Sequence, residues 1–420
     1  MQRETNVDVL ILGAGPAGLA AGSACQEAGL NFRIVEEGRQ IEKRDHRLEA
    51  ELGRGVGGAG LYSDGKFSFF PSATALWKLE PRGDLEISYA WLSSLLAKQS
   101  INVPETPLSS DLCTLSELNS FFLKVYPSIY ASIDKRMSLI DSLQSILLDR
   151  LLTMTRVLNL SVGVDSCHAA IANYEELAPI TIIAKKTILA TGRFGPLFIQ
   201  QASNLETVYR RLEVGIRIQQ PNNRFFLNNR PELDPKLVLD KHGEHFGWRT
   251  FCCCRDGQIV TIEQANVTVL SGRSDVRPTG FSNVGFHVRV RDPNQAQEVW
   301  ADLISRLTAA PPAKMPLAAF LCAASPALTP IGRLLGPTLS FALMYGLQQL
   351  LVEFGPASFD EATIHGPTLE GLGQYPKLGL DLKAQGLPVW GAGDVTGMFR
   401  GLVAALVSGY FVGLQARKFL

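Results

Sequence analysis

Three glycines near the start of the chain have the spacing that brings a peptide backbone close to a nucleotide pyrophosphate. In the GxGxxG run, Gly13 permits a tight turn, Gly15 lets phosphates approach the backbone, and Gly18 lets a helix pack closely on the preceding strand. The free amides at the start of that helix can then bind phosphate. Glu36 is placed to accept hydrogen bonds from an adenosine ribose, and its charge disfavours a 2′-phosphate. The pattern indicates FAD or NAD rather than NADP, although a glycine turn that merely packs would use the same residues.

A Gly-Asp pair near the end of the sequence is the second feature that could bind a ligand. The apolar run Leu387–Trp390 is followed by Gly391–Asp394 and then by a predicted helix from about Gly397 to Arg417. An acid at the end of a strand can bind a polyol chain, and a helix N-terminus can stabilise a negative charge. A turn with a helix cap explains this motif equally well on its own. Taken with the glycine turn, it predicts that both ends of the chain contact one ligand.

The elements that position the first motif follow the order of a dinucleotide-binding βαβ unit. Val7–Leu12 is an apolar run typical of a buried strand, Leu19–Ala28 is typical of a helix, and Asn31–Val35 predicts a second strand. The order of strand, glycine turn, helix, strand and acid separates a nucleotide-binding motif from a chance GxGxxG.

The rest of the chain alternates between helical and strand patterns. Residues from about 51 to 70 are so dense in glycine that they predict a loop with unusual backbone angles. Helices are predicted at 85–98, 115–129, 137–152, 295–307 and 339–354. Strands are predicted at 156–164, 180–189, 215–219, 249–254, 259–263 and 284–290, and the second of these ends in Ala190-Thr191-Gly192.

Composition excludes several classes of protein. The 420 residues are 46% hydrophobic, which is enough for a large core and for two or three domains. The 40 basic and 40 acidic residues balance, and the absence of a long basic run argues against a nucleic-acid partner. Residues 7–24 are apolar like a signal peptide, but their glycine spacing favours the βαβ unit. Gly401–Leu414 is too short to span a bilayer, so it predicts a buried helix.

The cysteines and histidines predict no metal site. The 7 cysteines are scattered without CxxC spacing, which indicates a reducing, cytoplasmic setting. Neighbours on a strand point to alternate faces, so Cys252-Cys253-Cys254 cannot chelate one metal well and are expected to be small buried residues. A thiol that reacts with a flavin is the alternative. His242 and His245 lie in a glycine-containing segment without a third ligand.

Taken together, these motifs resemble the FAD-binding fold of the glutathione-reductase-type superfamily: GAGPAG with Glu36, the Ala-Thr-Gly after strand 180–189, and Gly-Ala-Gly-Asp before the last helix. Residues 57–66 resemble the GGAG-x-x-SDGK segment of a family of bacterial FAD-dependent dehydrogenases, most of them of unassigned substrate. The stretch 247–260 and the C-terminal GAGDVTGMFRGLVAALVSG are also similar to that family. The superfamily resemblance covers about the first 70 residues, 180–195 and 365–420.

The resemblance implies FAD as the cofactor and a role for each matching segment. The glycine turn and Glu36 would hold the ADP half, Thr191-Gly192 would pass the adenine side, and Asp394 would bind the ribityl or pyrophosphate portion. The loop 57–66 would run beside the isoalloxazine ring, and the amides of residues 397 and 398 would face its N1/C2 edge. The full set of expected cofactor contacts is Gly13, Gly15, Pro16, Ala17, Gly18, Glu36, Glu37, Gly57, Gly58, Ser63, Asp64, Lys66, Val164, Thr191, Gly192, Gly393, Asp394, Gly397 and Met398.

Two departures from the superfamily pattern bear on the reaction. No CxxxxC lies on the first helix, so a disulfide relay is absent and the substrate would meet the flavin directly. No second GxGxxG follows a strand, so a separate NADPH domain is not expected. The catalytic residues are not identified, and Lys66 and Arg400 are the candidates. Lys66 could tune the flavin and Arg400 could bind an anionic substrate, whereas an ordinary ion pair or surface charge explains either residue.

The sequence therefore predicts an α/β protein with a discontinuous Rossmann-like FAD-binding domain and an inserted α+β substrate domain. The FAD-binding domain would comprise 1–72, 151–204 and 366–420, with a helical insertion or cap at 73–150 and the substrate domain at 205–365. The expected function is a FAD-dependent dehydrogenase or reductase of specialised metabolism, with a small organic substrate and with NAD(P)H or oxygen as the candidate redox partner. No membrane span is expected. A FAD-dependent monooxygenase and a non-catalytic flavin-binding protein are the alternatives, and the oligomeric state is left open.

Overall fold

The computed structural model describes residues 4–105, 115–174, 179–240 and 245–418. The chain divides into two compact units, and each is described by itself. Unit 1 comprises residues 1–111, 129–208 and 374–420, and unit 2 comprises residues 112–128 and 209–373.

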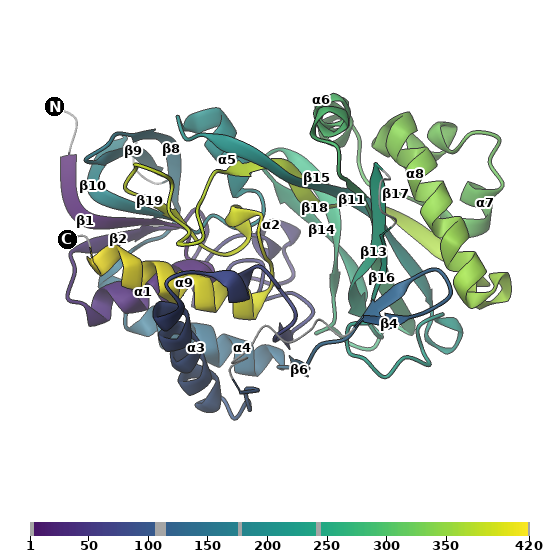
Figure 1. Ribbon diagram of the computed structural model, residues 1–420, viewed down its shortest axis with the longest axis horizontal. Helices are drawn as coiled ribbons and strands as arrows, with labels where there is room; N and C mark the ends of the chain where they lie inside the picture. Colours follow the sequence, from purple (N-terminus) through teal and green to yellow (C-terminus); the bar gives the residue numbers. More distant parts are fainter. Residues whose placement is uncertain (1–3, 106–114, 175–178, 241–244, 419–420) are drawn as a thin grey trace. The chain divides into compact units, whose positions relative to one another are not determined.

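Unit 1 contains a seven-stranded sheet with the order β7-β2-β1-β10-β9-β8, and β19 also pairs with β10 (Figure 1). Strand β1 lies between β2 and β10 and is parallel to both, and β19 is parallel to β10. Strands β9 and β8 extend the sheet in antiparallel fashion. The strands are β1 (Glu4–Leu12), β2 (Phe32–Val35), β7 (Leu151–Leu152), β8 (Thr155–Val162), β9 (Cys167–Asn173), β10 (Ile180–Leu189) and β19 (Val389–Gly391).

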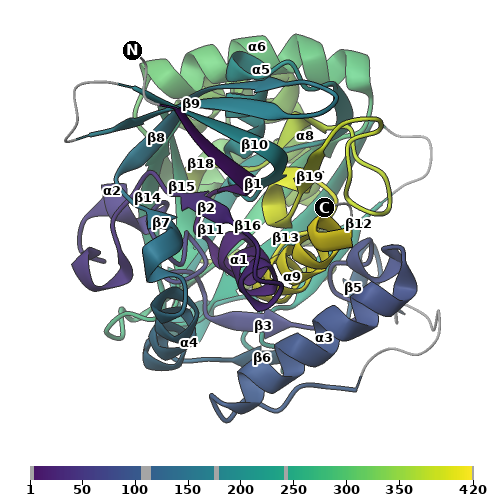
Figure 2. The same cartoon turned by 90° about the vertical axis from the view of Figure 1, so that its left-hand side faces the viewer.

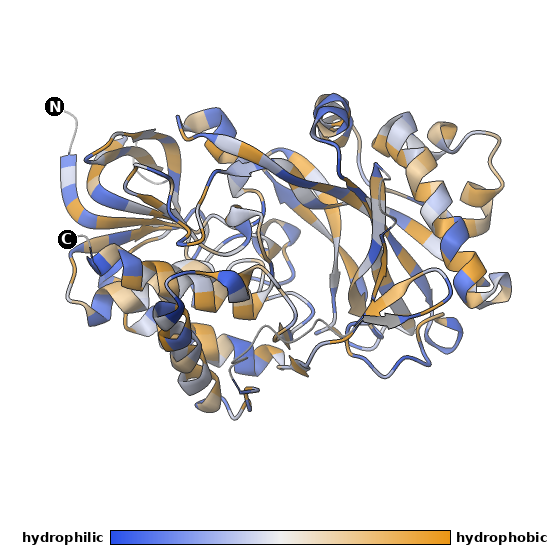
Figure 3. Cartoon of the chain, in the orientation of Figure 1, coloured by the Kyte–Doolittle hydropathy of each residue, from blue (hydrophilic) through white to orange (hydrophobic). Residues whose placement is uncertain are grey.

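The last four residues of the central strands β1 and β10 are buried, which explains the apolar residues at the end of each strand. Figure 3 shows hydrophobic and hydrophilic residues interspersed along the strands of this sheet. Leu10 and Leu12 of β1 share a core cluster with Ile199 of helix α5 (Gly195–Ala202). Helices α1 (Pro16–Glu27) and α9 (Leu402–Lys418) lie side by side along the sheet (Figures 1 and 2).

Small residues allow α1 and α9 to approach closely. A Cβ atom on Gly409 would lie 2.1 Å from the carbonyl oxygen of Ala17, and one on Gly413 would lie 2.6 Å from Cβ of Ala24. Helix α9 is buried along almost its whole length, as its apolar sequence predicted. The same contact brings the two ends of the chain together at the glycine turn.

The remaining elements of unit 1 lie in the first and middle parts of the chain. Tyr410 of α9 stacks on Trp91 of α3 with ring centroids 4.5 Å apart. The short strands β3 and β6 pair with one another. These elements are α2 (Glu49–Leu52), β3 (Lys66–Ser68), α3 (Arg82–Ala97), β6 (Ser128–Tyr130) and α4 (Ile133–Ser145).

Unit 2 contains an eight-stranded sheet with the order β17-β18-β11-β16-β13-β12-β5-β4 and a separate β14-β15 hairpin, and its described residues also form the α-helices α6, α7 and α8. Trp248 of β13 donates a hydrogen bond to the carbonyl oxygen of Ala342 in α8 at 2.8 Å, so this helix covers part of the sheet. The elements are β4 (Leu115–Glu117), β5 (Phe122–Lys124), β11 (Thr207–Pro221), β12 (Lys236–Leu239), β13 (Phe246–Cys254), β14 (Gln258–Gln264), β15 (Val267–Arg273), β16 (Phe281–Val290), α6 (Pro293–Ala309), β17 (Ala313–Pro316), α7 (Leu317–Leu321), α8 (Pro330–Phe354) and β18 (Thr363–Pro376).

A buried ion cluster joins three strands of this sheet. The carboxylate of Glu213 on β11 is fully buried and pairs with Arg249 on β13 and Arg289 on β16. Burial opposes ionisation of Glu213, but the two guanidinium groups outweigh it and hold the pKa of this carboxyl well below its usual range.

The structure corrects part of the predicted secondary structure. The helix predicted at 115–129 is wrong: β4 and β5 lie there, and β5 pairs with β12. Phe121 and Leu123 are buried in the alternating pattern of a strand, and the partner strand lies more than a hundred residues further along the chain. The helix predicted at 137–152 ends at Ser145. Strands β9, β12, β15, β17 and β18 were not predicted.

The α/β fold class and the Rossmann-like sheet with a second structural unit are confirmed. The assignment of a FAD-binding domain, a cap and a substrate domain to particular ranges stays a prediction. Among the described residues, no helix is long and apolar enough to cross a membrane. His242 lies outside the described residues.

Candidate cofactor-binding site

The glycine turn has the geometry that its sequence predicts. Gly13 has a φ of +102°, and its amide donates to the carbonyl oxygen of Val35 at 2.8 Å. A Cβ atom on Gly13 would lie 2.5 Å from the carbonyl oxygen of Ala190, and one on Gly18 would lie 1.8 Å from that of Gly13. Only glycine allows the strand, the turn and helix α1 to pack this closely.

The N-terminus of helix α1 is open to an anionic ligand. Gly15 is the N-cap residue, Pro16 occupies the first turn, and no side chain of the described residues caps the helix. The first turn contains no acidic residue. A Cβ atom on Gly15 would have its nearest neighbour, Cα of Gly58, at 3.8 Å. Because the first amides of a helix lack intrahelical acceptors, those of Ala17 and Gly18 suit the phosphates of a dinucleotide.

Glu36 ties the turn to the segment that follows β2. Its carboxylate is buried and accepts hydrogen bonds from the amides of Ala14, Gly38 and Gly55, each at 2.8 Å. A carboxylate offers about four acceptor positions, so one further donor, such as a ribose hydroxyl, can still be accommodated. Glu37 instead accepts a hydrogen bond from the hydroxyl of Tyr174 at 2.8 Å.

The glycine loop after residue 53 folds back onto the turn. The amide of Gly57 donates to the carbonyl oxygen of Ala14 at 2.9 Å, and Gly58 has a φ of +57°. A Cβ atom on Gly58 would lie 3.2 Å from Cα of Gly15. The fingerprint glycines and the GGAG segment therefore form one surface of backbone atoms.

Two buried arginines that the sequence analysis missed hold this loop. Arg44 donates to the carbonyl oxygens of Val56 at 2.7 Å and Gly58 at 3.1 Å, and its guanidinium lies 4.6 Å from the ring centre of Tyr62. Burial lowers the pKa of Arg44, and Tyr62, Glu36 and Glu51 oppose that shift. Arg136 of α4 donates to the carbonyl oxygen of Leu61 at 2.5 Å. Because both arginines bind backbone carbonyls, no residue pattern in a single sequence identifies them.

Lys66 and Asp64 form an ion pair within the loop. The Nζ atom of Lys66 lies 3.1 Å from Oδ2 of Asp64, and the lysine side chain is buried. The hydroxyl of Ser63 donates to the carbonyl oxygen of Gly60 at 2.8 Å. Of the two interpretations of Lys66 made from the sequence, the ion pair is present in the structure, and the flavin-tuning role stays a prediction.

The C-terminal Gly-Asp motif lies beside helix α1. The amide of Gly393 donates to the hydroxyl of Ser408 in α9 at 2.9 Å, and a Cβ atom on Gly393 would lie 3.1 Å from Cβ of Ala17. Asp394 accepts a hydrogen bond from Nε of Arg400 at 2.9 Å. The structure thus brings the two motifs from opposite ends of the sequence together.

The predicted helix at this motif begins later than expected. Residues 393–396 form a 3₁₀ turn, Gly397 ends it in the left-handed region with a φ of +68°, and α9 starts at Leu402. The amide of Gly397 donates to the carbonyl oxygen of Asp394, and that of Met398 to the hydroxyl of Thr396. The expectation of a helix N-terminus at 397 and 398 is wrong because positive φ angles at Gly397 and Gly401 interrupt the helical backbone.

Thr191 and Gly192 follow β10 at the same edge of the sheet as Gly13. The amide of Ala190 donates to the carbonyl oxygen of Leu12 at 2.8 Å, which fixes the two strand ends next to each other. The hydroxyl of Thr191 is buried and has no hydrogen-bond partner among the described residues. Val164 lies in the exposed turn between β8 and β9, where it lines a pocket with Lys186 and Pro388.

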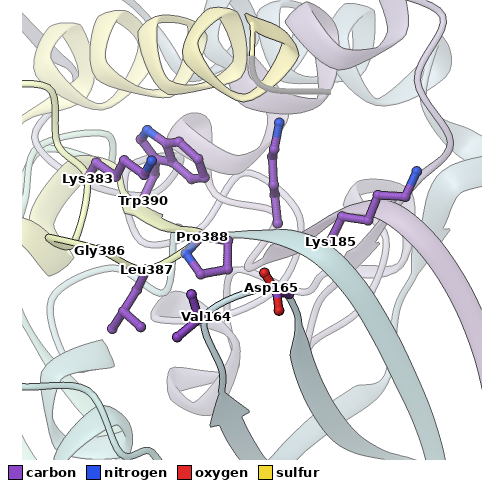
Figure 4. A pocket seen from close by; sticks show the side chains of 9 residues that line it. Val164, Asp165, Lys185, Lys383, Gly386, Leu387, Pro388 and Trp390 are labelled. Atoms are coloured by element: carbon purple, nitrogen blue, oxygen red, sulfur yellow. The ribbon is translucent and has the colours of Figure 1, made fainter.

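A pocket of about 420 Å³ lies beside Val164 in unit 1, where the partner of β10 changes from β9 to β19 (Figure 4). Lys185, Lys186 and Lys383 line it, and Figure 4 shows Lys185 directed away from Lys383. Lys185 pairs with Asp8 at 2.8 Å, and Lys186 donates to the carbonyl oxygen of Ala416 at 2.7 Å. The ammonium group of Lys383 lies 4.9 Å from the ring centre of Trp390. The three ammonium groups thus do not converge on one point.

Comparison with known proteins identifies the first segment. Residues 8–44 match a family model described as FAD binding domain, and this range includes the second half of β1, the glycine turn, Glu36 and Arg44. No curated protein matches the sequence. This match and the geometry of the turn define the chain as a FAD-binding flavoprotein, and its cofactor is FAD.

Solved structures show similarity at low identity. The substrate-free rebeccamycin biosynthetic enzyme RebC is 13% identical with a TM-score of 0.40, and the match covers 99% of this chain and 64% of RebC. A variant of FrdA from E. coli quinol fumarate reductase is 14% identical with a TM-score of 0.44, covering 99% of this chain and 70% of that one. CtdE in complex with FAD is 11% identical with a TM-score of 0.40, covering 98% and 84%. This chain therefore spans less than two thirds of the RebC chain.

Proposed function

We propose that the protein is a FAD-dependent dehydrogenase or reductase whose small organic substrate reacts directly at the flavin. The observation that carries the proposal is the backbone surface formed by the glycine turn, the loop at Gly57-Gly58 and the Gly393 motif, which lie together at the open N-terminus of α1. When bound, FAD supplies the two-electron redox chemistry.

The residues of this surface divide the binding of FAD among them. The amides of Ala17 and Gly18 bind the pyrophosphate, Glu36 binds the adenosine ribose, and Thr191 supplies a hydroxyl on the adenine side. Asp394 binds the ribityl or pyrophosphate portion, and Arg400 keeps its carboxylate in place. Arg44 and Arg136 hold the glycine loop in shape for the flavin ring.

The thiol content of helix α1 supports a direct reaction at the flavin. Cys25 is the only cysteine of α1, and burial raises the pKa of its thiol to about 12. A thiol with such a pKa stays protonated and unreactive near neutral pH. A dithiol relay on this helix is therefore not available, and the substrate receives or delivers its electrons at the flavin itself.

The finer assignments belong to the same proposal. We place the chain in the glutathione-reductase-type superfamily and beside the GGAG-x-x-SDGK dehydrogenases, with unit 2 supplying the substrate domain. Lys66 is the candidate for tuning the flavin, and Arg400 is the candidate for binding an anionic substrate. The buried free cysteines fit the reducing, cytoplasmic setting that we propose.

Anaerobic spectroscopy of the purified protein tests the enzyme proposal. Bound oxidised flavin absorbs at about 450 nm. We expect NAD(P)H or at least one class of organic donor to bleach this band, and an acceptor to restore it over repeated cycles. Flavin that dithionite reduces but that every nicotinamide and organic donor leaves oxidised would contradict the proposal and favour a non-catalytic flavin-binding protein. Incorporation of labelled oxygen from O₂ into a product would instead favour the monooxygenase.

A further inference from the structure

The three consecutive cysteines of β13 lie in unit 2 and have no role in the proposed cofactor site. All three are buried, with exposed fractions of 8% for Cys252, 1% for Cys253 and 0% for Cys254. The expectation that they are buried is confirmed. The expectation of strict alternation along the strand needs correction, because the structure has a bulge there.

The bulge brings two of the sulfurs together. Register with β16 shifts between Phe251 and Cys254, and Cys252 adopts a left-handed φ of +53°. The Sγ atoms of Cys252 and Cys254 lie 3.7 Å apart. In a regular strand, the Cα atoms of residues two apart are separated by roughly 6.6 Å. This is close to the upper limit of the Cα–Cα distance in a disulfide. A bulge bends the strand and changes this geometry.

A buried guanidinium lies against this pair. Nη2 of Arg217 is 3.6 Å from Sγ of Cys254 and donates to the carbonyl oxygen of Cys252 at 2.6 Å. Nε of Arg217 donates to Oδ1 of Asn283 at 2.6 Å, which holds the guanidinium in position. A Cβ atom on Gly272 of β15 would lie 2.7 Å from the sulfur of Cys254 and even closer to Nη2 of Arg217, so the hairpin backbone packs against both groups.

The charge of Arg217 favours the thiolate form of its neighbours. Burial lowers the pKa of Arg217, but the electrostatic interaction with Cys254 and Cys252 outweighs the effect of burial, so the pKa of Arg217 is raised. The coupling is reciprocal, because a fixed positive charge next to a thiol lowers the free energy of its anion. The thiolate is the form that attacks peroxides and disulfides.

We propose that Cys252 and Cys254 are a redox-active dithiol that closes to an intramolecular disulfide when hydrogen peroxide oxidises Cys252. The thiolate of Cys252 attacks one peroxide oxygen, so an S–O bond forms and the O–O bond breaks. Hydroxide departs, and Cys252 becomes a sulfenic acid. The thiolate of Cys254 then attacks that sulfur, so the S–S bond forms, the S–O bond breaks, and a second hydroxide leaves. The two hydroxides combine with the two thiol protons as water, and the sulfurs have given two electrons to one peroxide.

This dithiol is independent of the proposed function, because no step requires FAD. Cys253 provides the matched control, because it is as buried as Cys254 and adjacent in sequence. Its backbone amide donates to Oδ1 of Asp234 at 2.9 Å. The exposed Cys322 reports whether peroxide has reacted at all.

Peptide mass spectrometry of the full-length protein tests the proposal. After a peroxide pulse, alkylation and trypsin cleavage, the peptide 250–255 should have lost two hydrogen masses, with fragments that assign the bond to Cys252 and Cys254. Cys253→Ala should form the same bond, and Cys254→Ser should instead leave a sulfenic acid that dimedone traps. Arg217→Met should slow closure about tenfold, because the thiolate loses its neighbouring positive charge. A wild-type peptide that stays fully reduced while Cys322 is oxidised, or a bond that involves Cys253, would overturn the proposal even if the other variants fail to fold.

Discussion

At the scale of single residues, the carboxylate of Glu36 stabilises the fold in addition to its expected contact with a ribose. It binds three backbone amides from three segments, and these amides fix the glycine turn against the loop that follows β2. Hydrogen bonds to a buried charged group contribute about 1.5 to 3 kcal/mol each, so the site and the fold depend on the same side chain.

Glu36→Gln is therefore expected to lower both stability and FAD affinity. A glutamine offers one acceptor oxygen, so at least one of the amides of Ala14, Gly38 and Gly55 loses its partner. We expect the free energy of unfolding to fall by about 2 kcal/mol in a urea titration. Glu37→Gln is the matched control, and we expect a change within about 0.5 kcal/mol because its partners lie near the surface. Equal effects of the two substitutions would contradict this role of Glu36.

At the scale of elements, the contact between α1 and α9 decides whether the two ends of the chain meet. Gly409→Ala improves helix propensity by up to about 1 kcal/mol, but the added methyl group would lie 2.1 Å from the carbonyl oxygen of Ala17. We expect a net loss of stability of about 1 to 3 kcal/mol, together with weaker FAD binding. Gly83→Ala in α3 is the control, since a Cβ atom there meets nothing within 4 Å. A Gly409→Ala variant as stable as Gly83→Ala would show that the helices can separate without cost.

The pairing of β17 with β18 should respond to pH through His365. This histidine lies opposite Lys314, and burial, then Lys314 and Arg217, lower its pKa to about 4. The folded state therefore binds this proton less readily than the unfolded state, whose histidine has a pKa of about 6.5. Stability is full above about pH 6.5 and falls as the pH drops towards 4.

The contribution of His365 to the free energy of unfolding that is lost over this pH range is about 1 to 2 kcal/mol after allowance for screening by solvent. His365→Gln should remove this part of the pH dependence of unfolding between pH 4 and 6.5. An unchanged profile in the variant would exclude His365 as its source. The hydroxyl of Thr363 lies 3.0 Å from Nε2 of His365. Because Thr363 carries no charge, it adds no titration of its own to this pH dependence.

At the scale of the whole molecule, the sequence predicted those elements that depend on the spacing of nearby residues, and it missed several that depend on pairing with distant segments. The order of β1, the glycine turn, α1 and β2 follows from hydrophobic runs and glycine spacing, and β10 was predicted with the bounds that the structure has. Residues 115–129 were assigned to a helix because a single sequence does not reveal that β5 pairs with β12. Arg44 and Arg136 were missed because their acceptors are carbonyl oxygens, which every residue has.

The central claim, that the open N-terminus of α1 holds the pyrophosphate of FAD, is tested most directly by titrating deflavinated protein with FAD. Gly15 has an ordinary φ of −69°, and a Cβ atom there would make only an ordinary van der Waals contact, at 3.8 Å from Cα of Gly58. Gly15→Ala should therefore fold normally while its methyl group occupies the approach of the phosphates. We expect its Kd for FAD to rise at least about tenfold, or 1.4 kcal/mol, and that of Gly83→Ala to match the wild type. Wild-type protein that binds no FAD, or Gly15→Ala that binds it as tightly as wild type, would contradict the account.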